Sequence, residues 1–195
     1  MAEVVVPPLV TGRLRLGGWG PAEREALAAL NADPEVMRYF PSTQDRARTD
    51  QLLQRIEQSF AERGWGLWAV TPVATGVCIG FVGLLAMPDG VPGAGGVEVG
   101  WRLARSGWGQ GYATEAATAV LDHAFGPVGL AEVWSMTAVL NLPSQAVMRR
   151  LGMELHTRFE HPALEVGSPL RPHVVFRTTA QAWRGRRAPG GRVPA

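Results

Sequence analysis

An uncharged stretch from Gly64 to Pro88 sets the strongest limit on what this chain can fold into. Its length would allow a helix to cross a bilayer. However, Pro72 and the turn-like segment Thr71–Gly76 divide it into two apolar runs, Trp65–Val70 and Val77–Met87, which are rich in Val, Trp, Ile and Phe. Short runs of this composition on either side of a turn are typical of buried strands. We therefore predict two core strands here and no membrane span.

Strand-like and helix-like patterns alternate along the rest of the chain. We predict further strands at Leu9–Trp19, Val97–Leu103, Leu130–Leu140, Met153–Phe159 and His173–Thr178. We predict helices at Pro21–Asn31, Asp33–Arg38, from Ser42 to about Arg63, after the glycines near 111, and at Pro143–Leu151. Ser42, with Asp45 three residues later, resembles a capping box that opens the third of these helices. Such alternation indicates an α/β (α+β) fold.

Composition favours one domain. The chain has 195 residues, of which 46% are hydrophobic and 18% charged, so global disorder is excluded. We assign residues 9–183 to the domain and expect residues 184–195, rich in Arg, Gly and Pro, to form a disordered tail. The single Cys78 excludes an internal disulfide, and the first residues lack a basic, apolar signal pattern. These features lead us to expect a cytoplasmic protein.

Charge argues against a nucleic-acid partner. All 19 basic residues are arginines, and four of them, at 184, 186, 187 and 192, lie in the expected tail. The remaining 15 arginines are outnumbered by 17 acidic residues, so the predicted domain lacks a general positive charge. A nucleic-acid adaptor that uses the tail stays a lesser alternative.

A glycine-dense loop connects the strand Val97–Leu103 to the next helix. The loop has glycines at 107, 109 and 111, and the helix has a face of small residues suited to close packing on a sheet: Ala113, Ala116, Ala117, Val120, Leu121 and Ala124. A strand, a glycine turn and a helix start together place free backbone N–H groups and a positive helix dipole around one point. This arrangement indicates a phosphate site, although the spacing matches neither the dinucleotide fingerprint nor the P-loop.

These segments resemble the GNAT superfamily of acetyl-CoA-dependent N-acetyltransferases, and within it the subgroup related to enzymes that acetylate ribosomal-protein N-termini. The resemblance covers about Leu9 to Trp183. It rests on the segments Val97–Leu103, Trp108–Ala116, Asn141–Ser144 and Val147–Met153, supported by Thr11–Leu16 and Asp33–Met37. It implies a mixed, mostly antiparallel sheet that is flanked by helices and splayed where acetyl-CoA enters.

The resemblance also implies where acetyl-CoA binds. It places the pantetheine arm and acetyl carbonyl on the strand backbone of Trp101, Arg102 and Leu103, and adds Asn141 to the cofactor site. The pyrophosphate would lie on the amides of Trp108, Gly109, Gln110, Gly111, Tyr112 and Ala113. Trp108 and Gln110 occupy loop positions where the family often carries basic or amide residues, so the remaining CoA phosphate needs another cation. Arg105, Arg149 and Arg150 are the candidates.

Amine acetylation needs a proton acceptor for the amine and a donor for the leaving thiolate. Glu98 is our candidate base, acting through water, with a plain polar position on the strand as the alternative. Ser144 is our candidate acid, with a helix cap as the alternative. Many family members use a tyrosine as the acid, and Ser144–Met153 contains none.

We therefore predict a monomeric or homodimeric N-acetyltransferase that uses acetyl-CoA and no metal. Its acceptor would be a primary amine on a peptide N-terminus or a small molecule, attacked directly, with walls around Met37–Phe40 and Glu160–Arg171. A non-catalytic acyl-CoA-binding module is the alternative. Cys78 is expected to be a core residue, and the histidines at 156, 161 and 173 lack a metal-binding spacing.

Overall fold

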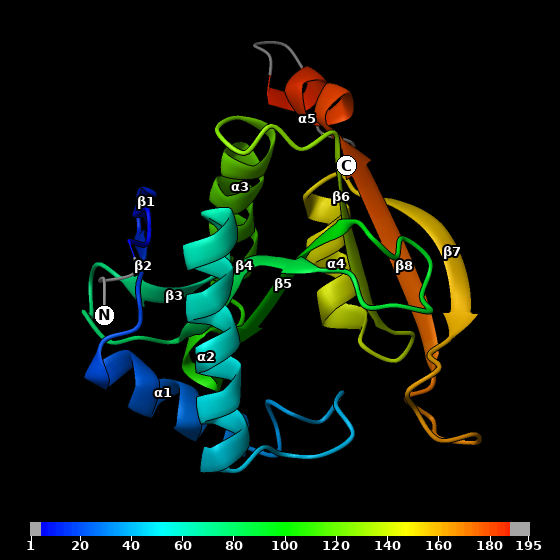
Figure 1. The fold of residues 1–195 in the computed structure, drawn as a ribbon, viewed down its shortest axis with the longest axis horizontal. Helices are drawn as coiled ribbons and strands as arrows, with labels where there is room; N and C mark the ends of the chain where they lie inside the picture. Colours follow the sequence, from blue (N-terminus) through cyan, green and yellow to red (C-terminus); the bar gives the residue numbers. More distant parts are fainter. Residues whose placement is uncertain (1–4, 188–195) are drawn as a thin grey trace. The chain divides into compact units, whose positions relative to one another are not determined.

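A computed structural model describes residues 5–187 of the chain (Figure 1). Its strands are β1 (Leu9–Val10), β2 (Leu14–Gly17), β3 (Leu67–Pro72), β4 (Gly80–Ala86), β5 (Val97–Leu103), β6 (Glu132–Ala138), β7 (Glu154–Glu160) and β8 (Pro172–Thr179). Its helices are α1 (Pro21–Ala32), α2 (Arg46–Arg63), the short 3-10 helix η1 (Arg105–Gly107), α3 (Tyr112–Phe125), α4 (Leu142–Arg150) and α5 (Ala180–Arg187).

The strands are ordered β1-β2-β3-β4-β5-β6-β8-β7. β5 and β6 run parallel, with Glu98 opposite Trp134. Antiparallel pairing joins β1 to β2, β2 to β3, β3 to β4, β6 to β8 and β7 to β8. The predicted mixed, mostly antiparallel sheet with flanking helices is confirmed.

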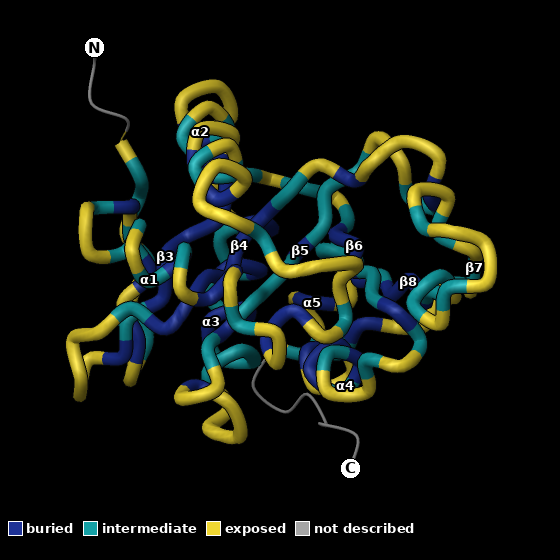
Figure 2. Tube along the Cα trace, turned by 90° about the horizontal axis from the view of Figure 1, so that it is seen from below, coloured by how far each residue is buried: buried dark blue, intermediate teal, exposed yellow. Residues whose placement is uncertain are grey.

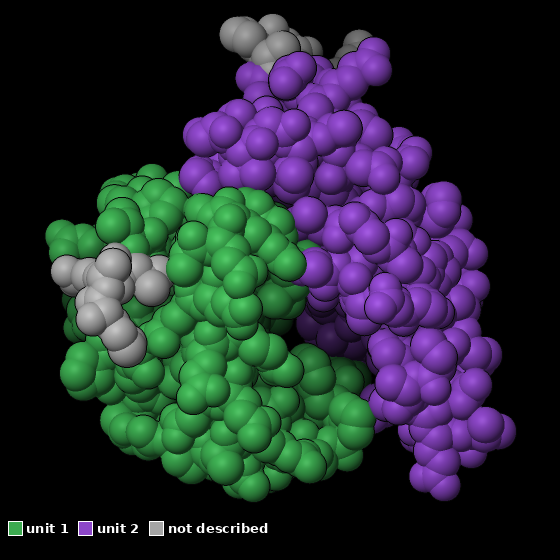
Figure 3. Space-filling view, viewed as in Figure 1, with its two compact units in different colours: residues 1–85, 100–120 green, residues 86–99, 121–195 purple. Residues whose placement is uncertain are grey.

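The described chain forms two compact units, coloured separately in Figure 3. Unit 1 comprises residues up to Leu85 together with Gly100–Val120, and unit 2 comprises Ala86–Val99 together with the chain from Leu121. β5 therefore begins in unit 2 and ends in unit 1. The assignment of residues 9–183 to one domain stays a prediction.

Unit 1 is organised around β3 and β4, the two strands predicted from the uncharged stretch. In Figure 2 the buried residues gather along both strands, as their burial patterns require. Trp68 on β3 is fully buried and meets Phe60 of α2 edge to face, with ring centroids 5.0 Å apart. Among the described residues, no helix is long and apolar enough to cross a membrane.

Unit 2 is built on β6, β8 and β7, with β8 in the middle. Val175 on β8 is fully buried in a cluster with Met87, Val91 and Trp134. The predicted strands at 130–140, 153–159 and 173–178 agree with β6, β7 and β8 to within a few residues.

Three local predictions near the N-terminus are wrong. The expected strand Leu9–Trp19 is interrupted by a turn in which the Thr11 amide donates to the Leu14 carbonyl, 3.0 Å, so that β1 and β2 pair as a hairpin. Residues 33–38 form turns rather than a helix. Asp45 rather than Ser42 caps α2, because its carboxylate accepts a hydrogen bond from the Arg48 amide, 2.8 Å.

The expected disorder from Arg184 onward is also wrong over its first four residues, which lie in α5. Trp183 is buried, and its indole N–H donates to the Asp122 carboxylate of α3, 2.8 Å. Arg187 pairs with the other oxygen of Asp122, 2.7 Å. These contacts stabilise α5 on unit 2. The rest of the predicted tail lies outside the described residues.

Candidate active site

The loop between β5 and α3 is held in place by its own side chains. The Trp108 indole N–H donates to the Leu103 carbonyl at the end of β5, 2.7 Å, and the Gln110 amide donates to the Ser106 carbonyl, 2.7 Å. Gly107 is buried, and a Cβ built there would lie 2.9 Å from Cδ1 of Ile79. The first glycine of the loop is therefore needed for packing, whereas the next two have another role.

Gly109 and Gly111 shape the path of the backbone. Both adopt the left-handed conformation, with φ of 71° and 78°. Open space surrounds the Cβ position of Gly109. These residues let the chain reverse while the outer face of the loop stays free of side-chain bulk.

The amides that follow form a run of unused donors. The Trp108 amide, which was expected to hold pyrophosphate, donates instead to the Arg105 carbonyl, 3.1 Å. From Gly109 to Thr114, no backbone N–H donates to an acceptor within residues 5–187, and the first intrahelical bond of α3 is donated by Glu115 to the Gly111 carbonyl, 3.0 Å. The last three of these amides lie in the first turn of α3, at the positive end of the helix dipole. Adjacent free N–H groups fit the oxygens of a pyrophosphate, as acetyl-CoA carries.

Sequence reasoning missed an arginine beside this loop. Nη2 of Arg13 lies 3.6 Å from the Cβ position of Gly111, and the Arg13 guanidinium stacks on the Tyr112 ring at 4.9 Å. Arg13 also pairs with Glu115 of α3, with Nε 2.7 Å from Oε2. Burial opposes ionisation of Glu115, but hydrogen bonds from Thr11 and Arg13 together with the Arg13 charge lower its pKa. Residues distant in sequence thus place a cation at the start of α3.

The three arginines named for the remaining CoA phosphate are engaged in different ways. Arg105 is exposed and pairs with Asp33, 3.2 Å. Arg149 donates to the Gln145 side chain, 3.2 Å, and lies over the Phe176 ring. Arg150 is exposed, and its carbonyl accepts a hydrogen bond from Arg186, 3.0 Å. A phosphate role for any of them stays a prediction.

Glu98 lies at the start of β5 and is half-buried. Within the described part of the chain, its carboxylate forms no hydrogen bond or ion pair. Loss of solvation raises the pKa of Glu98 to about 7. A carboxylate with this pKa can both accept and release a proton at neutral pH.

Asn141 and Ser144 meet at the start of α4, in unit 2. The Asn141 side chain caps the helix by accepting from the Ser144 amide, 3.2 Å, and its own amide donates to Thr137, 2.9 Å. The alternative in which Ser144 is the cap is therefore wrong. The Ser144 hydroxyl donates to no acceptor among the residues described, so it is available for another role.

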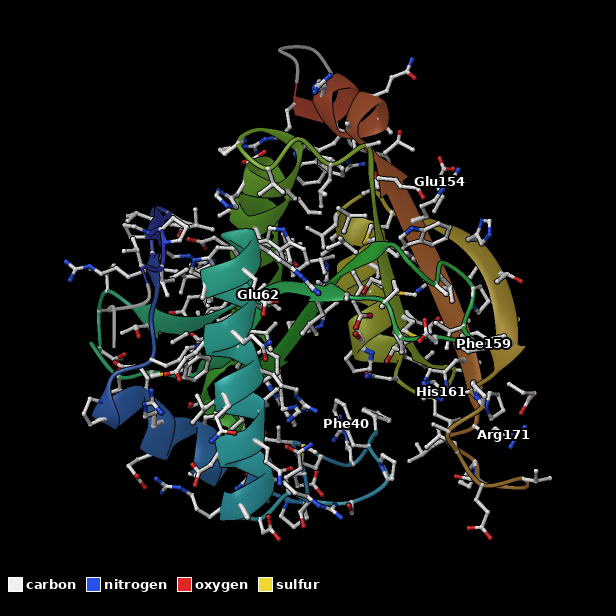
Figure 4. The ribbon with its side chains drawn as sticks, in the orientation of Figure 1. Phe40, Glu62, Glu154, Phe159, His161 and Arg171 are labelled. Carbon is white, nitrogen blue, oxygen red and sulfur yellow. The ribbon has the colours of Figure 1, made fainter. Side chains whose placement is uncertain are left out.

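Aromatic and charged side chains gather on the β7–β8 connection and the strand ends beside it. Figure 4 labels Phe159 on β7 and, from the connection, His161 and Arg171. Phe159, His161 and His173 pack together, with the two imidazoles 4.8 Å apart, and burial lowers the pKa of both histidines. Arg171 pairs with Glu160, 3.3 Å. A role for this connection in acceptor binding stays a prediction.

Two other sequence interpretations concern reactive side chains. Cys78 is half-buried, and burial raises the pKa of its thiol, which suits a packing residue better than a nucleophile. Among residues 5–187, no three His, Cys, Asp or Glu side chains lie close enough together to hold a metal ion.

Comparisons with known proteins identify the family. Residues 13–154 match the family model of the acetyltransferase (GNAT) domain. FsC-acetyl coenzyme A-N(2)-transacetylase from Aspergillus fumigatus is 32% identical over 192 residues, which cover 91% of this chain and 78% of that protein.

Solved structures share the fold. An acetyltransferase from Agrobacterium tumefaciens is 28% identical with a TM-score of 0.72, and the match covers 91% of this chain and 97% of that one. RimL, a ribosomal-protein alpha-N acetyltransferase in complex with coenzyme A, has a TM-score of 0.73 at 17% identity, with 90% and 99% covered. At this identity the likeness is one of fold alone. Because the family model matches most of its length, the chain belongs to the GNAT family of acetyltransferases.

Proposed function

We propose that this enzyme transfers the acetyl group of acetyl-CoA to a primary amine by direct attack, without a covalent enzyme intermediate. Membership of the GNAT family supports acetyl transfer from acetyl-CoA. Acetyl-CoA supplies an activated thioester, and the six free amides from Gly109 to Thr114 bind its pyrophosphate. The name of the Aspergillus relative, an acetyl-coenzyme-A-dependent N(2)-transacetylase, is consistent with an amine acceptor.

Glu98 is the observation that favours turnover over CoA binding alone. The amine nitrogen must lose a proton as its bond to the acetyl carbon forms, and Glu98 accepts that proton through a water molecule. An unpaired carboxylate with a pKa of about 7 suits this role, because it is ionised in a large fraction of molecules at neutral pH and remains a useful base. A binding module would have no need of such a group.

Ser144 completes the proton balance. The carbon–sulfur bond breaks as the amide forms, and the thiolate of CoA must be protonated or held by a donor. The Ser144 hydroxyl donates this hydrogen bond, which it is free to do because it donates to no acceptor among the residues described. Asn141 therefore serves the cofactor side indirectly, by fixing the first turn of α4.

The acceptor we favour is an N-terminal peptide amine or a small-molecule amine rather than an aminoglycoside. A polycationic acceptor would need a cluster of unpaired acids. Five acids lie near the segments expected to hold the acceptor. Asp33, Glu35 and Glu160 are paired with arginines, and Asp45 caps α2. Among the described residues this leaves Glu165 without a side-chain partner, and one carboxylate is not a cluster.

A turnover screen tests this function. Acetyl-CoA is incubated with N-terminal peptides, simple amines, polyamines and aminoglycosides, and free thiol is followed. We expect amine-dependent thiol release by the wild type and its loss in Glu98→Gln. CoA binding without thiol release for any amine would favour the acyl-CoA-binding module. An aminoglycoside preferred a hundredfold over every peptide and simple amine would overturn the ranking of acceptors.

A further inference from the structure

Arg102 on β5 is a cation with no acidic partner. Its guanidinium lies against two rings, 4.3 Å from the Phe40 centroid and 5.3 Å from that of Phe81, and Nη1 donates to the side-chain oxygen of Asn31. No carboxylate within residues 5–187 pairs with it. Some other arginines of unit 1 do have such partners: Arg13, Arg24, Arg38, Arg46 and Arg105. What sets Arg102 apart is that it is half-buried against two rings at once and has no carboxylate partner among the residues described.

Asn31, the uncharged partner of Arg102, is held in place by a second hydrogen bond. Asn31, near the end of α1, is fully buried, and its amide nitrogen donates to the hydroxyl of Thr49 on α2, 3.0 Å, which is also fully buried. This bond leaves the Asn31 oxygen directed at Arg102. Because an amide oxygen carries no net charge, it orients the guanidinium and leaves its positive charge uncompensated.

One edge of the guanidinium is unused. Nε of Arg102 is enclosed and has no hydrogen-bond partner, whereas Asn31 occupies Nη1. Nε and Nη2 present two parallel N–H donors on the same edge, which is the arrangement that matches a carboxylate. Loss of solvation lowers the pKa of Arg102 to about 10, so it remains charged at neutral pH. A buried, unsatisfied donor on a charged group is costly unless a ligand completes it.

We infer that Arg102 binds an anionic oxygen group of the acceptor, so that the preferred acceptor is an amine that also carries a carboxylate. This inference rests on the proposed function and narrows its substrate class. Phe40 supports the acceptor as the source of the anion, because this residue is 38% exposed and lies in the segment between α1 and α2 (Figure 4). The pyrophosphate of CoA has its own donors in the amides from Gly109 to Thr114.

Binding of matched product pairs tests the inference without requiring turnover. The probes are N-acetylated straight-chain amino acids of two to six carbons and their primary amides, titrated by calorimetry in the presence of CoA. We expect the best acid to bind the wild type at least tenfold more tightly than its amide, about 1.4 kcal/mol. We expect the corresponding free amino acid to be acetylated with the same preference, expressed mainly in KM.

Two variants distinguish charge recognition from a fold defect. Arg102→Met should remove the preference for the acid and leave amide binding unchanged. Asn31→Asp should also remove it, because the new carboxylate would pair with Arg102, while thermal unfolding should show that the fold is at least as stable as the wild type. Arg55→Met, at an exposed arginine on α2, is the matched control and should keep the full preference.

The remaining outcomes of these experiments would each decide for or against the role of Arg102. Equal binding of acid and amide by the wild type would overturn the inference. A loss of CoA affinity in Arg102→Met, with the acid preference intact, would assign Arg102 to a phosphate of CoA and overturn it as well. Absence of acetyl transfer to any amine would contradict the proposed function, and the acid preference in binding would still decide the role of Arg102.

Discussion

Glu98 is a half-buried carboxyl group without a partner among the described residues. These two properties determine how the activity and the stability of the protein should depend on pH. With a pKa of about 7, the base form accumulates as pH rises through 7. We expect kcat/KM of the wild type to rise over this range and then level off. Glu98→Gln should lower kcat by roughly 10²–10⁴-fold with little change in CoA affinity. A pH–rate profile of both proteins checks this, and wild-type kcat in the variant at pH 7 would contradict it.

Burial of Glu98 should also cost stability at high pH. A carboxyl whose pKa is raised on folding contributes most below its unfolded value, near 4.5, and this contribution is lost as pH rises to about 7. We therefore expect Glu98→Gln to gain stability over the wild type between pH 5 and 8, by up to about 3 kcal/mol. Urea unfolding at pH 4.5 and pH 8 measures the difference, which should be small at the lower pH. The opposite pH dependence would show that the carboxylate is solvated or paired in solution.

At the scale of elements, substitutions in the loop before α3 test whether its glycines serve ligand binding as well as backbone conformation. Gly109→Val and Gly111→Val each place a branched side chain at a left-handed position beside the free amides. We expect at least tenfold weaker CoA binding, measured by calorimetry.

The matched control for the loop is Gly64→Val. Gly64 ends α2 with φ of 74° and open space around its Cβ position, so it carries the same backbone penalty, roughly 1–2 kcal/mol. It should lose that stability and retain CoA affinity. Unchanged CoA affinity in a folded Gly111→Val protein would refute the role of the loop.

The start of α4 allows two neighbouring polar residues to be told apart. Asn141→Ala should destabilise the fold by about 1 kcal/mol, because it removes the cap from the Ser144 amide. Ser144→Ala should leave stability nearly unchanged and lower kcat, if its hydroxyl serves the leaving thiolate. Thermal unfolding and thiol-release assays on both variants check this. A stability loss in Ser144→Ala equal to that of Asn141→Ala would point to a purely structural hydroxyl.

Local patterns predicted the elements well where one signal dominated. The strand β5, the glycine loop and the small-residue face of α3 were all evident from the sequence, and five of the six residues predicted on that face are fully buried. Errors arose where two local signals competed. Ser42 and Asp45 are both good caps, and only the packing of α2 decides between them. The Asp33-Pro34 pair suggested a helix start, but the following residues close into turns.

Contacts between distant residues could not be predicted in the same way. Asn31 and Arg102 are separated by 71 positions, and no sequence pattern in α1 or β5 predicts their hydrogen bond. The Thr11, Arg13 and Glu115 network likewise joins a turn to a helix more than 100 positions away. These contacts depend on how the strands order within the sheet, which periodicity does not specify.

At the scale of the whole molecule, α5 shows that residues with the composition of a tail belong to the folded part. Arg184–Arg187 have the composition of a tail, yet Asp122 anchors both Trp183 and Arg187. We expect a chain that ends at Trp183 to unfold at a lower temperature than one that ends at Arg187, with a loss of about 1 kcal/mol, since exposed ion pairs contribute little. Differential scanning calorimetry measures this, and Asp122→Asn in the longer chain should reproduce part of the loss. Equal unfolding temperatures would place the end of the folded part at Trp183.

The buried Gly107 has a consequence for how sequences of this fold can diverge. Because its Cβ position lies 2.9 Å from Cδ1 of Ile79, the size of the residue just before β4 limits how closely the loop before α3 can pack against that strand. Among related sequences, a larger residue at one of the two positions should therefore occur with a smaller residue at the other. An alanine at 107, for example, should be accompanied by valine or a smaller residue at 79. Under the proposed function, substitutions in the hydrophobic interior would then change the affinity for CoA, even where every glycine of the exposed turn is retained.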